Sequence, residues 1–248
     1  MANWNDPQPR PTDLGTGFGA SPSLDGRAVG QVGYDQGLRR HMLSIYNYMA
    51  SGVLLSGVVA LLFARSGLAL QVMASPLRWL IVLAPFGFIF AMNYRRSAGT
   101  LQALFWGFCT VMGLSLSTIF LVYTGASIAS TFFATAGAFA GLSLFGYTTQ
   151  RNLSGMGSFL VMGLVGIIIA MVINVFLQSP GLMFAVSILG VLIFAGLTAY
   201  DTQRLKAEYY QLAGTEFAGK AVVLGALGLY LDFINMFMFL LRFMGNRN

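Results

Sequence analysis

The chain has 248 residues, of which 56% are hydrophobic and only 9% are charged. A soluble globular domain carries about 25% charged residues, so this chain cannot cover a water-facing surface. Its long unbroken apolar runs lack the alternation of a β-barrel strand and predict an all-α, polytopic membrane protein.

Few residues of the kind that bind metals or carry out covalent chemistry occur in the chain. The single Cys109 excludes an intramolecular disulfide and a thiolate-rich metal site, and the single His41 leaves a membrane zinc site without a second imidazole. The 14 Lys and Arg residues are scattered between apolar runs rather than gathered on one face, which argues against nucleic acid as a partner. We therefore expect no cofactor and no nucleic-acid partner.

Residues 1–38 differ in composition from the rest of the chain. They contain four of the seven prolines and seven glycines, with few aliphatic residues. Such a segment cannot bury enough apolar surface to offset the entropy of ordering, so we predict a disordered cytoplasmic tail over residues 1–38 and a transmembrane domain over residues 39–248. No apolar core follows within the first 30 residues, so we expect an uncleaved first span rather than a signal peptide.

Seven apolar segments follow the tail, each close to the ~20 residues that cross a bilayer as a helix. We expect them near residues 42–64, 78–94, 101–123, 126–148, 157–178, 182–203 and 220–242. The second segment is the shortest and contains Pro85, so its limits are the least well defined. The short connectors at 124–125 and 179–181 predict antiparallel neighbours.

The distribution of basic residues predicts a cytoplasmic N-terminus. With that orientation, ten Lys and Arg residues lie on the cytoplasmic side and four on the other. Seven crossings then place the C-terminus outside. A re-entrant last segment is the alternative, because it would return Arg242 and Arg247 to the cytoplasmic side.

A G-x-x-x-G motif in the fourth segment, Gly137 and Gly141, suggests close helix packing. Glycine is also common in membrane helices generally, so the motif does not identify a partner helix.

Two aspartates lie where ionisation is costly. Asp232 is twelve residues into the last segment, and Asp201 lies at the end of the sixth. Insertion scales give about 2.5–3.5 kcal/mol for an Asp at the centre of a membrane helix. If the sixth helix continues to about residue 210 and the seventh begins near residue 218, a helical hairpin places both carboxyls within roughly 4–5 Å of the same height.

Two carboxyls at one height in a poor dielectric cannot both ionise cheaply, so we expect Asp201 and Asp232 to share a proton and titrate as a unit. When both ionise, they form an oxygen site suited to a hard cation such as Ca²⁺. One alternative is a hydrogen-bonded pair that only joins two helices. Another is an aspartyl protease dyad, but Leu229-Tyr-Leu precedes Asp232 in place of Gly-x-Gly, and no Pro-Ala-Leu lies near the C-terminus.

Three further polar residues complete the candidate site. Arg95 and Arg96 end the second segment on the side of Asp201, and either could pair with it as a latch. A basic pair after a membrane span is more often a topology anchor. Asn235 follows Asp232 by three residues and shares its helical face.

Three stretches of sequence carry a resemblance to a known family. Residues 199–206 (AYDTQRLK), residues 231–237 (LDFINMF) and residues 141–160 resemble the Bax inhibitor-1, or transmembrane Bax inhibitor motif, family and its bacterial YccA-like branch. The resemblance covers about residues 38–245. It implies a bundle of seven transmembrane helices with the last helix at the centre.

The resemblance also implies a function: a pH-sensitive cation leak channel, for Ca²⁺, gated by a proton-sharing pair that falls on Asp201 and Asp232. These two residues would bind Ca²⁺ transiently as the transported ion, and the latch would fall on Arg95, with Arg96 one step away. Some members carry an acidic residue in the second span, where this chain has only apolar residues around Ala84.

On this interpretation the protein is not an enzyme, and its partners are the lipid bilayer, Ca²⁺ and protons. The alternative function is a membrane interaction protein that modulates a membrane-bound protease or a stress response. The short loops and the lack of a targeting signal suit a multi-pass protein of the bacterial inner membrane.

Overall fold

The computed structural model describes the backbone of residues 25–93 and 95–248, and the side chains of residues 36–93 and 95–248. The chain divides into two units, Met1–Gly37 and Leu38–Asn248. In the first unit the described part is the beginning of helix α1. The predicted tail otherwise falls on residues 1–24, which lie outside the described residues.

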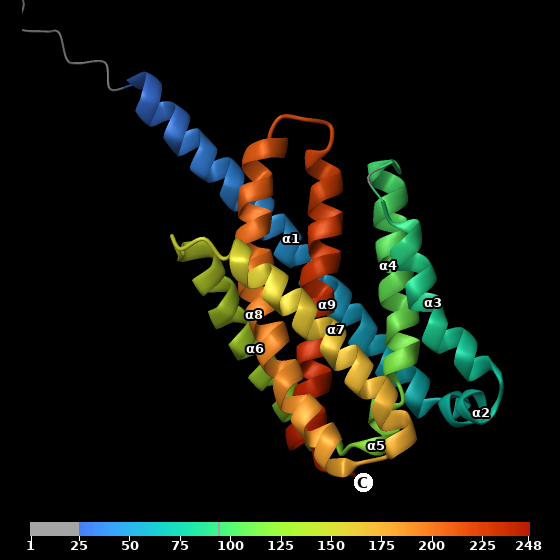
Figure 1. Cartoon of the computed structure of the whole chain (residues 1–248). Helices are drawn as coiled ribbons and strands as arrows, with labels where there is room; N and C mark the ends of the chain where they lie inside the picture. Colours follow the sequence, from blue (N-terminus) through green and yellow to red (C-terminus); the bar gives the residue numbers. More distant parts are fainter. Residues whose placement is uncertain (1–24, 94) are drawn as a thin grey trace, which may run out of the picture. The chain divides into compact units, whose positions relative to one another are not determined.

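The described residues form helices joined by short connections. They are α1 (Asp25–Arg65), α2 (Leu68–Ala74), α3 (Leu77–Ala91), α4 (Ala98–Leu116), α5 (Ile119–Val122), α6 (Gly125–Thr148), α7 (Ser154–Leu177), α8 (Pro180–Leu212) and α9 (Ala218–Met244) (Figure 1). Six helical segments are long and apolar enough to cross a membrane, and the bent pair α2–α3 is the seventh candidate. The predicted all-α, polytopic membrane fold is confirmed.

Local sequence sets where several of these helices begin. Ser97, Thr124 and Ser179 each precede a helix, and each side chain accepts a hydrogen bond from the backbone N–H three residues on, at 3.2, 3.2 and 3.3 Å. Pro180 follows Ser179 at the first helical position, where no amide donor is needed. Gly214, with φ of 78°, supplies the left-handed residue in the turn between α8 and α9.

The second predicted span differs most from expectation. The structure divides this region into α2 and α3, which are bent by 96° relative to each other. Pro76 explains the break, because a proline disfavours helical geometry in the preceding residue, and Ser75 is extended (φ −99°, ψ 164°). The 15 residues of α3 rise only about 22 Å, short of the ~30 Å hydrocarbon core.

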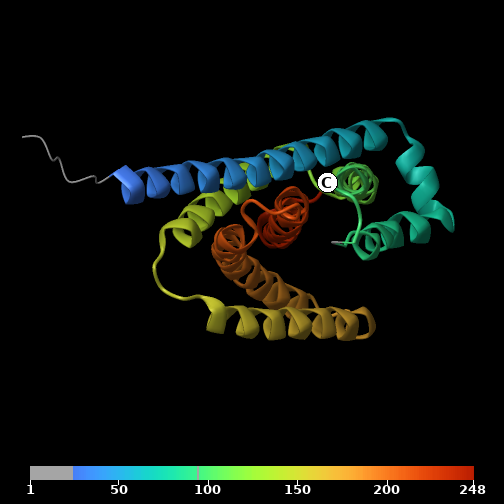
Figure 2. The same cartoon turned by 90° about the horizontal axis from the view of Figure 1, so that it is seen from above.

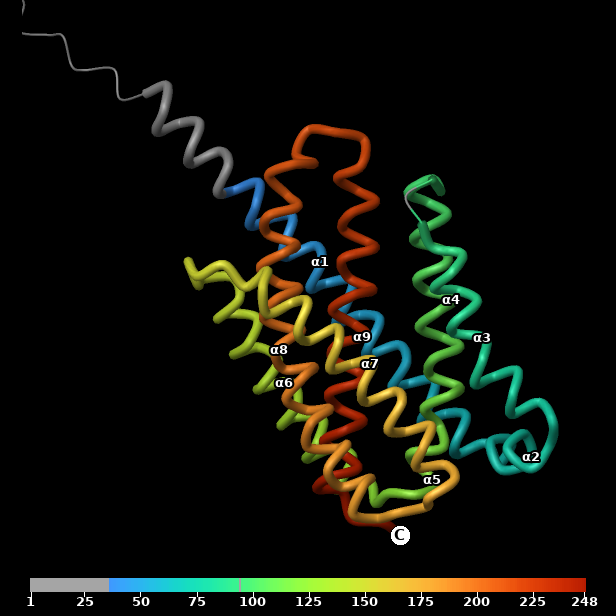
Figure 3. The backbone as a smooth tube through the Cα atoms, viewed as in Figure 1, coloured from blue at the N-terminus to red at the C-terminus, as the bar shows by residue number. Residues whose placement is uncertain are grey.

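Helix α3 runs antiparallel beside α4 (Figure 3). Near one end, the Ser115 hydroxyl donates to the Ile81 carbonyl oxygen at 2.8 Å. Seven residues further along α3, the Phe88 ring packs on Gly107, where a Cβ atom would lie 2.7 Å from the ring. The two helices therefore stay in contact over most of the length of α3.

The last helix lies at the centre of the Leu38–Asn248 unit, as the resemblance implies. In the most apolar stretch of α9, 67% of the residues are buried, against 17–39% in the corresponding stretches of the other candidate spans. Figure 2 shows α9 between α1, α4, α6 and α8. At its middle, the buried Tyr230 hydroxyl lies 2.7 Å from Ser56 Oγ, which lies 2.7 Å from the Cys109 carbonyl oxygen. Because the carbonyl can only accept, Tyr230 donates to Ser56, and this chain joins α9, α1 and α4.

Helix α9 crosses the whole bundle. It is unbroken over 27 residues, which rise about 40 Å. After it, the Asn246 N–H donates to Ser127 Oγ at 2.7 Å, and the Asn248 N–H donates to the Val122 carbonyl oxygen at 3.0 Å. Both contacts lie at the α5–α6 connection, at the opposite end from the α8–α9 turn (Figure 1). The re-entrant alternative is therefore wrong for the last segment, and the only such break in the described residues lies between α2 and α3.

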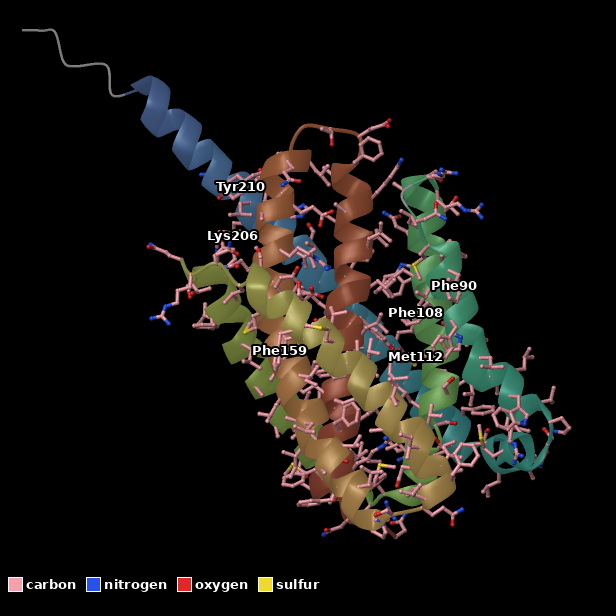
Figure 4. All side chains as sticks on the ribbon, in the orientation of Figure 1. Phe90, Phe108, Met112, Phe159, Lys206 and Tyr210 are labelled. Atoms are coloured by element: carbon pink, nitrogen blue, oxygen red, sulfur yellow. The ribbon has the colours of Figure 1, made fainter. Side chains whose placement is uncertain are left out.

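Large apolar side chains cover the outer surface of the bundle. Phe90 on α3 is 83% exposed, and Phe176 on α7 is 81% exposed. Figure 4 labels Phe90 and, on α7, Phe159, which is also exposed. Exposed apolar surface of this extent marks contact with lipid.

The closest helix packing does not use the predicted motif. A Cβ atom at Gly137 or Gly141 would meet no atom within 4 Å, so the prediction of close packing through these glycines is wrong within this chain. At Gly146, five residues further along α6, a Cβ would clash with the carbonyl oxygen of Ala199 on α8. Only glycine allows the two backbones this approach.

We expect Gly146→Ala to lower the free energy of unfolding by about 1–3 kcal/mol, because the added methyl group must push α6 away from the α8 backbone. The matched control is Gly141→Ala, on the same helix, where the methyl group meets open space. Thermal unfolding of the two purified variants in detergent measures the difference. Equal melting temperatures would contradict the close approach of α6 and α8.

Candidate functional site

The structure brings Asp201 of α8 and Asp232 of α9 together inside the bundle. Their side chains are close enough for one carboxyl to donate a hydrogen bond to the other when one of them is protonated. Asp201 is 9% exposed and Asp232 is 5% exposed. The carboxyls meet at one depth because α8 ends at Leu212 and α9 begins at Ala218, as the hairpin geometry predicts.

Close backbone contacts hold α8 in place around Asp201. Two residues earlier, the Ala199 carbonyl lies against Gly146 of α6. On the other side, Gly228 of α9 borders the site: a Cβ atom there would make ordinary van der Waals contacts, 3.7 Å from Asp201 Oδ2 and 3.9 Å from Arg204 Nη2. Gly228 lies one helical turn before Asp232, so the face of α9 that carries the second carboxyl also borders Asp201 and Arg204 at Gly228.

Arg204 is the basic partner of the pair. Its Nη1 lies 3.3 Å from Asp201 Oδ1, one turn along α8, and its side chain is 51% exposed whereas that of Asp201 is 12% exposed. Asp232 Oδ2 is buried and has no hydrogen-bond partner in the described part of the chain. An unpartnered buried carboxylate oxygen is costly. Among the described residues, Asp201 therefore has an ion-pair partner, whereas Asp232 Oδ2 lies buried without a hydrogen-bond partner.

The other predicted site residues do not contact the pair in this conformation. Arg95 and Arg96 are exposed between α3 and α4, and the ion pair of Asp201 is with Arg204 instead. The Asn235 amide donates to the Leu231 carbonyl oxygen of its own helix at 2.8 Å. Arg204 was missed as a partner, although its position three residues after Asp201 is the spacing at which helical side chains meet.

The residues after Asp201 fix α8 to other helices. Thr202 Oγ1 donates to Ser143 Oγ of α6 at 3.4 Å and lies 3.5 Å from the Tyr46 hydroxyl of α1. The Gln203 side chain accepts from the Leu153 N–H and donates to the Arg151 carbonyl oxygen, both at 2.8 Å. A movement of α8 at Asp201 would therefore disturb its contacts with α1, with α6 and with the α6–α7 connection.

A partly polar cavity of about 530 Å³ lies between the aspartate pair and the α8–α9 turn. Its lining residues come from α8 and α9: Arg204, Leu205, Ala207, Glu208, Gln211, Leu224 and Gly225. Because Arg204 both lines this cavity and contacts Asp201, its side chain stands between the cavity and the pair.

The pair itself offers two carboxyl groups as possible ligands for a cation. The described residues contain no group of three or more His, Cys, Asp and Glu side chains that could hold a metal. Bound Ca²⁺ takes six to eight oxygen ligands. Two carboxylates supply a part of that shell.

Comparison with known proteins identifies the family of the chain. A family model described as "Inhibitor of apoptosis-promoting Bax1" matches residues 38–248. The inner membrane protein YbhL of Escherichia coli K12 is 46% identical over 218 residues, which cover 85% of this chain and 93% of YbhL. A Caulobacter vibrioides protein is 46% identical over 250 residues (94% and 98% of the two chains), and a Rickettsia prowazekii protein 45% over 218 residues (86% and 92%). The chain belongs to the Bax inhibitor-1 family.

Proposed function

We propose that this protein is a pH-sensitive cation leak channel, for Ca²⁺, gated by the Asp201–Asp232 pair. The observation that supports the proposal is the meeting of two buried carboxyls from neighbouring helices, with a half-exposed arginine at one of them. A pair that only joined two helices would not need this counter-ion beside a polar cavity.

The proton shared by the two carboxyls keeps the path closed at low pH. A hydrogen bond between Asp201 and Asp232 then holds α8 against α9. When the proton leaves, two negative charges face each other in a poor dielectric and separate. Asp201 has Arg204 as a partner, and Asp232 presents its oxygens to a passing cation from the central helix.

The cavity beyond the pair offers a route toward the α8–α9 end of the bundle. The polar side chains of Arg204, Glu208 and Gln211 line it, so it suits a hydrated cation. This mechanism involves no covalent step and no cofactor, and Ca²⁺ is the transported ion. We therefore propose that the protein is not an enzyme.

Flux measurements with purified protein test the proposal against a role as a modulator of a membrane-bound protease. The full chain is reconstituted into liposomes of pure lipid that enclose a Ca²⁺-sensitive dye, and uptake is followed across acidic to neutral pH. A channel conducts without any other protein and conducts more as pH rises. Protein-free liposomes are the control. Uptake equal to this control at every pH would contradict the proposal and leave the modulator function in its place.

We also propose that the protein lies in the bacterial inner membrane with its N-terminus in the cytoplasm. A reporter that is active only in the cytoplasm is then expected to be silent when fused after Asn248, because seven crossings place the two ends of the chain on opposite sides. The same reporter fused before Met1 should be active. Strong activity of the C-terminal fusion would show that the bent α2–α3 pair does not cross the membrane.

A further inference from the structure

A second cavity, lined by a different set of residues from the polar one, opens between α1 and α6. Its volume is about 840 Å³, and its walls are mostly apolar. Met42 and Met49 of α1 form one wall, Ala136 and Ala140 of α6 form the other, and Phe233 of α9 lies at the base. The small side chains of Ala136 and Ala140 explain why the two helices leave a hollow here.

The cavity is a groove open to the lipid-facing surface. Leu43, Leu54 and Leu144 line it and are 49%, 69% and 63% exposed. In a membrane-spanning bundle this rim faces hydrocarbon, so the molecules that can enter from the side are lipids.

One basic side chain lines the end of the groove that lies near the start of the membrane domain, and a second, Lys206, lies behind Tyr147 without lining the groove. Arg39 of α1 and Tyr147 of α6 line this end. Lys206 of α8, labelled in Figure 4, donates to the Tyr147 carbonyl oxygen at 2.9 Å and lies 5.2 Å from the centroid of the Tyr147 ring. No acidic side chain is among the described residues that line the groove.

Hydroxyl groups lie deeper in the groove. Tyr46, seven residues after Arg39 on α1, is about 10 Å further along the helix axis. Tyr46 and Ser143 both line the groove, and both contact the hydroxyl of Thr202. From the Arg39 end inward, the groove offers a cation, then hydroxyls, and beyond the hydroxyls its walls are apolar at Met49 and Val53. This is the order of phosphate, ester groups and acyl chains along a phospholipid.

We infer that the α1–α6 groove binds one anionic glycerophospholipid, with its phosphate at Arg39 and an acyl chain along Met49, Val53 and Phe233. Basic pockets between membrane helices are the usual binding sites for anionic headgroups. The site does not depend on ion flux through the aspartate pair. Through Tyr46, Ser143 and Thr202 the lipid would contact the part of α8 that carries Asp201.

Native mass spectrometry of the full chain in detergent tests this site with two probes, phosphatidylglycerol and phosphatidylcholine of identical chains. The wild type is expected to retain one phosphatidylglycerol in preference to phosphatidylcholine. Arg39→Gln should weaken that preference about five-fold, the contribution of one basic residue near anionic lipid. Arg40→Gln is the matched control, because Arg40 is adjacent and exposed but does not line the groove. Glycerol 3-phosphate, which has no acyl chains, should not compete.

A second pair of variants tests the acyl-chain part of the groove. Ala140→Phe fills the groove and should abolish retention of either lipid, whereas Ala138→Phe, on the same helix but outside the groove, should leave it unchanged. If Ala140→Phe does not fold, the comparison of Arg39→Gln with Arg40→Gln decides alone. Equal retention of both lipids by the wild type, or the same loss in a variant and its control, would overturn the inference and indicate only non-specific surrounding lipid.

Discussion

Replacement of either Asp201 or Asp232 by asparagine is expected to abolish the pH dependence of Ca²⁺ flux. Asparagine has nearly the shape of aspartate, so the helices can still pack, but it cannot ionise. In the wild type, low pH keeps a proton between the carboxyls and closes the path. A rise in pH removes this proton and opens it, so flux increases with pH. With one ionisable member the shared proton is lost, and flux stays at one level across the range.

The two variants should differ in how they bind Ca²⁺. Asp232 lies on the central helix, and its Oδ2 has no partner in the described residues, so it is the oxygen that faces a cation. Asp232→Asn should therefore raise the Ca²⁺ concentration for half-maximal flux by at least about ten-fold, because a charged ligand is lost. Asp201→Asn should raise it less, since Arg204 already compensates the Asp201 charge.

Uptake of Ca²⁺ into proteoliposomes across acidic to neutral pH measures both effects. Glu216→Gln is the control, because it makes the same change from acid to amide at an exposed position in the α8–α9 turn. Variants that retain the wild-type pH profile would show that the pair only joins α8 to α9, and the channel mechanism would be wrong.

The meeting of the two aspartates could be predicted from sequence because it depends on helix length. The rise per residue is constant, so a hairpin that turns at Gly214 brings residues at similar distances from the turn to one height. The break between α2 and α3 was harder to place. Pro76 lies within an apolar stretch, so hydropathy does not reveal the break there. Pro85 is the proline in the middle of the predicted span, but α3 continues through it.

Helix faces could not be assigned from the sequence, for a physical reason. In a membrane the outer surface is as apolar as the interior, so hydropathy does not distinguish a face that packs from one that meets lipid. Gly141 and Gly146 lie on the same helix, yet one faces open space and the other the backbone of α8. The same ambiguity hid Tyr46 and Ser143, whose contacts with Thr202 join three helices.

Composition does not identify Arg204 as the partner of Asp201, but helix geometry does. In sequence it is one of several basic residues near the predicted end of a span, where topology anchors are common. The expected continuation of the helix to about residue 210 already places Arg204 one turn beyond Asp201, and the structure adds the contact itself, at 3.3 Å. The structure thus provides a different partner for Asp201 from Arg95 and Arg96.

Arg204→Gln is expected to move the midpoint of flux against pH upward by about half a pH unit. The guanidinium stabilises a negative charge on Asp201, so its loss makes removal of the shared proton harder. A half-exposed ion pair contributes about 0.2–1 kcal/mol, and one pH unit corresponds to 1.36 kcal/mol. On the rising part of the profile, flux at a fixed pH should therefore fall about three-fold.

The pH midpoint of Arg204→Gln must be measured separately from its maximal flux. Arg204 lines the polar cavity, so its replacement also removes a positive charge that opposes the passage of Ca²⁺ and is expected to raise the maximal flux. Arg151→Gln is the matched control: its side chain is exposed, and its backbone carbonyl still accepts from Gln203. The double variant Arg95→Gln, Arg96→Gln tests the latch predicted from sequence. An upward shift in that variant, with none in Arg204→Gln, would mean that the conducting state uses the predicted latch and that the ion pair at Arg204 belongs to the closed state alone.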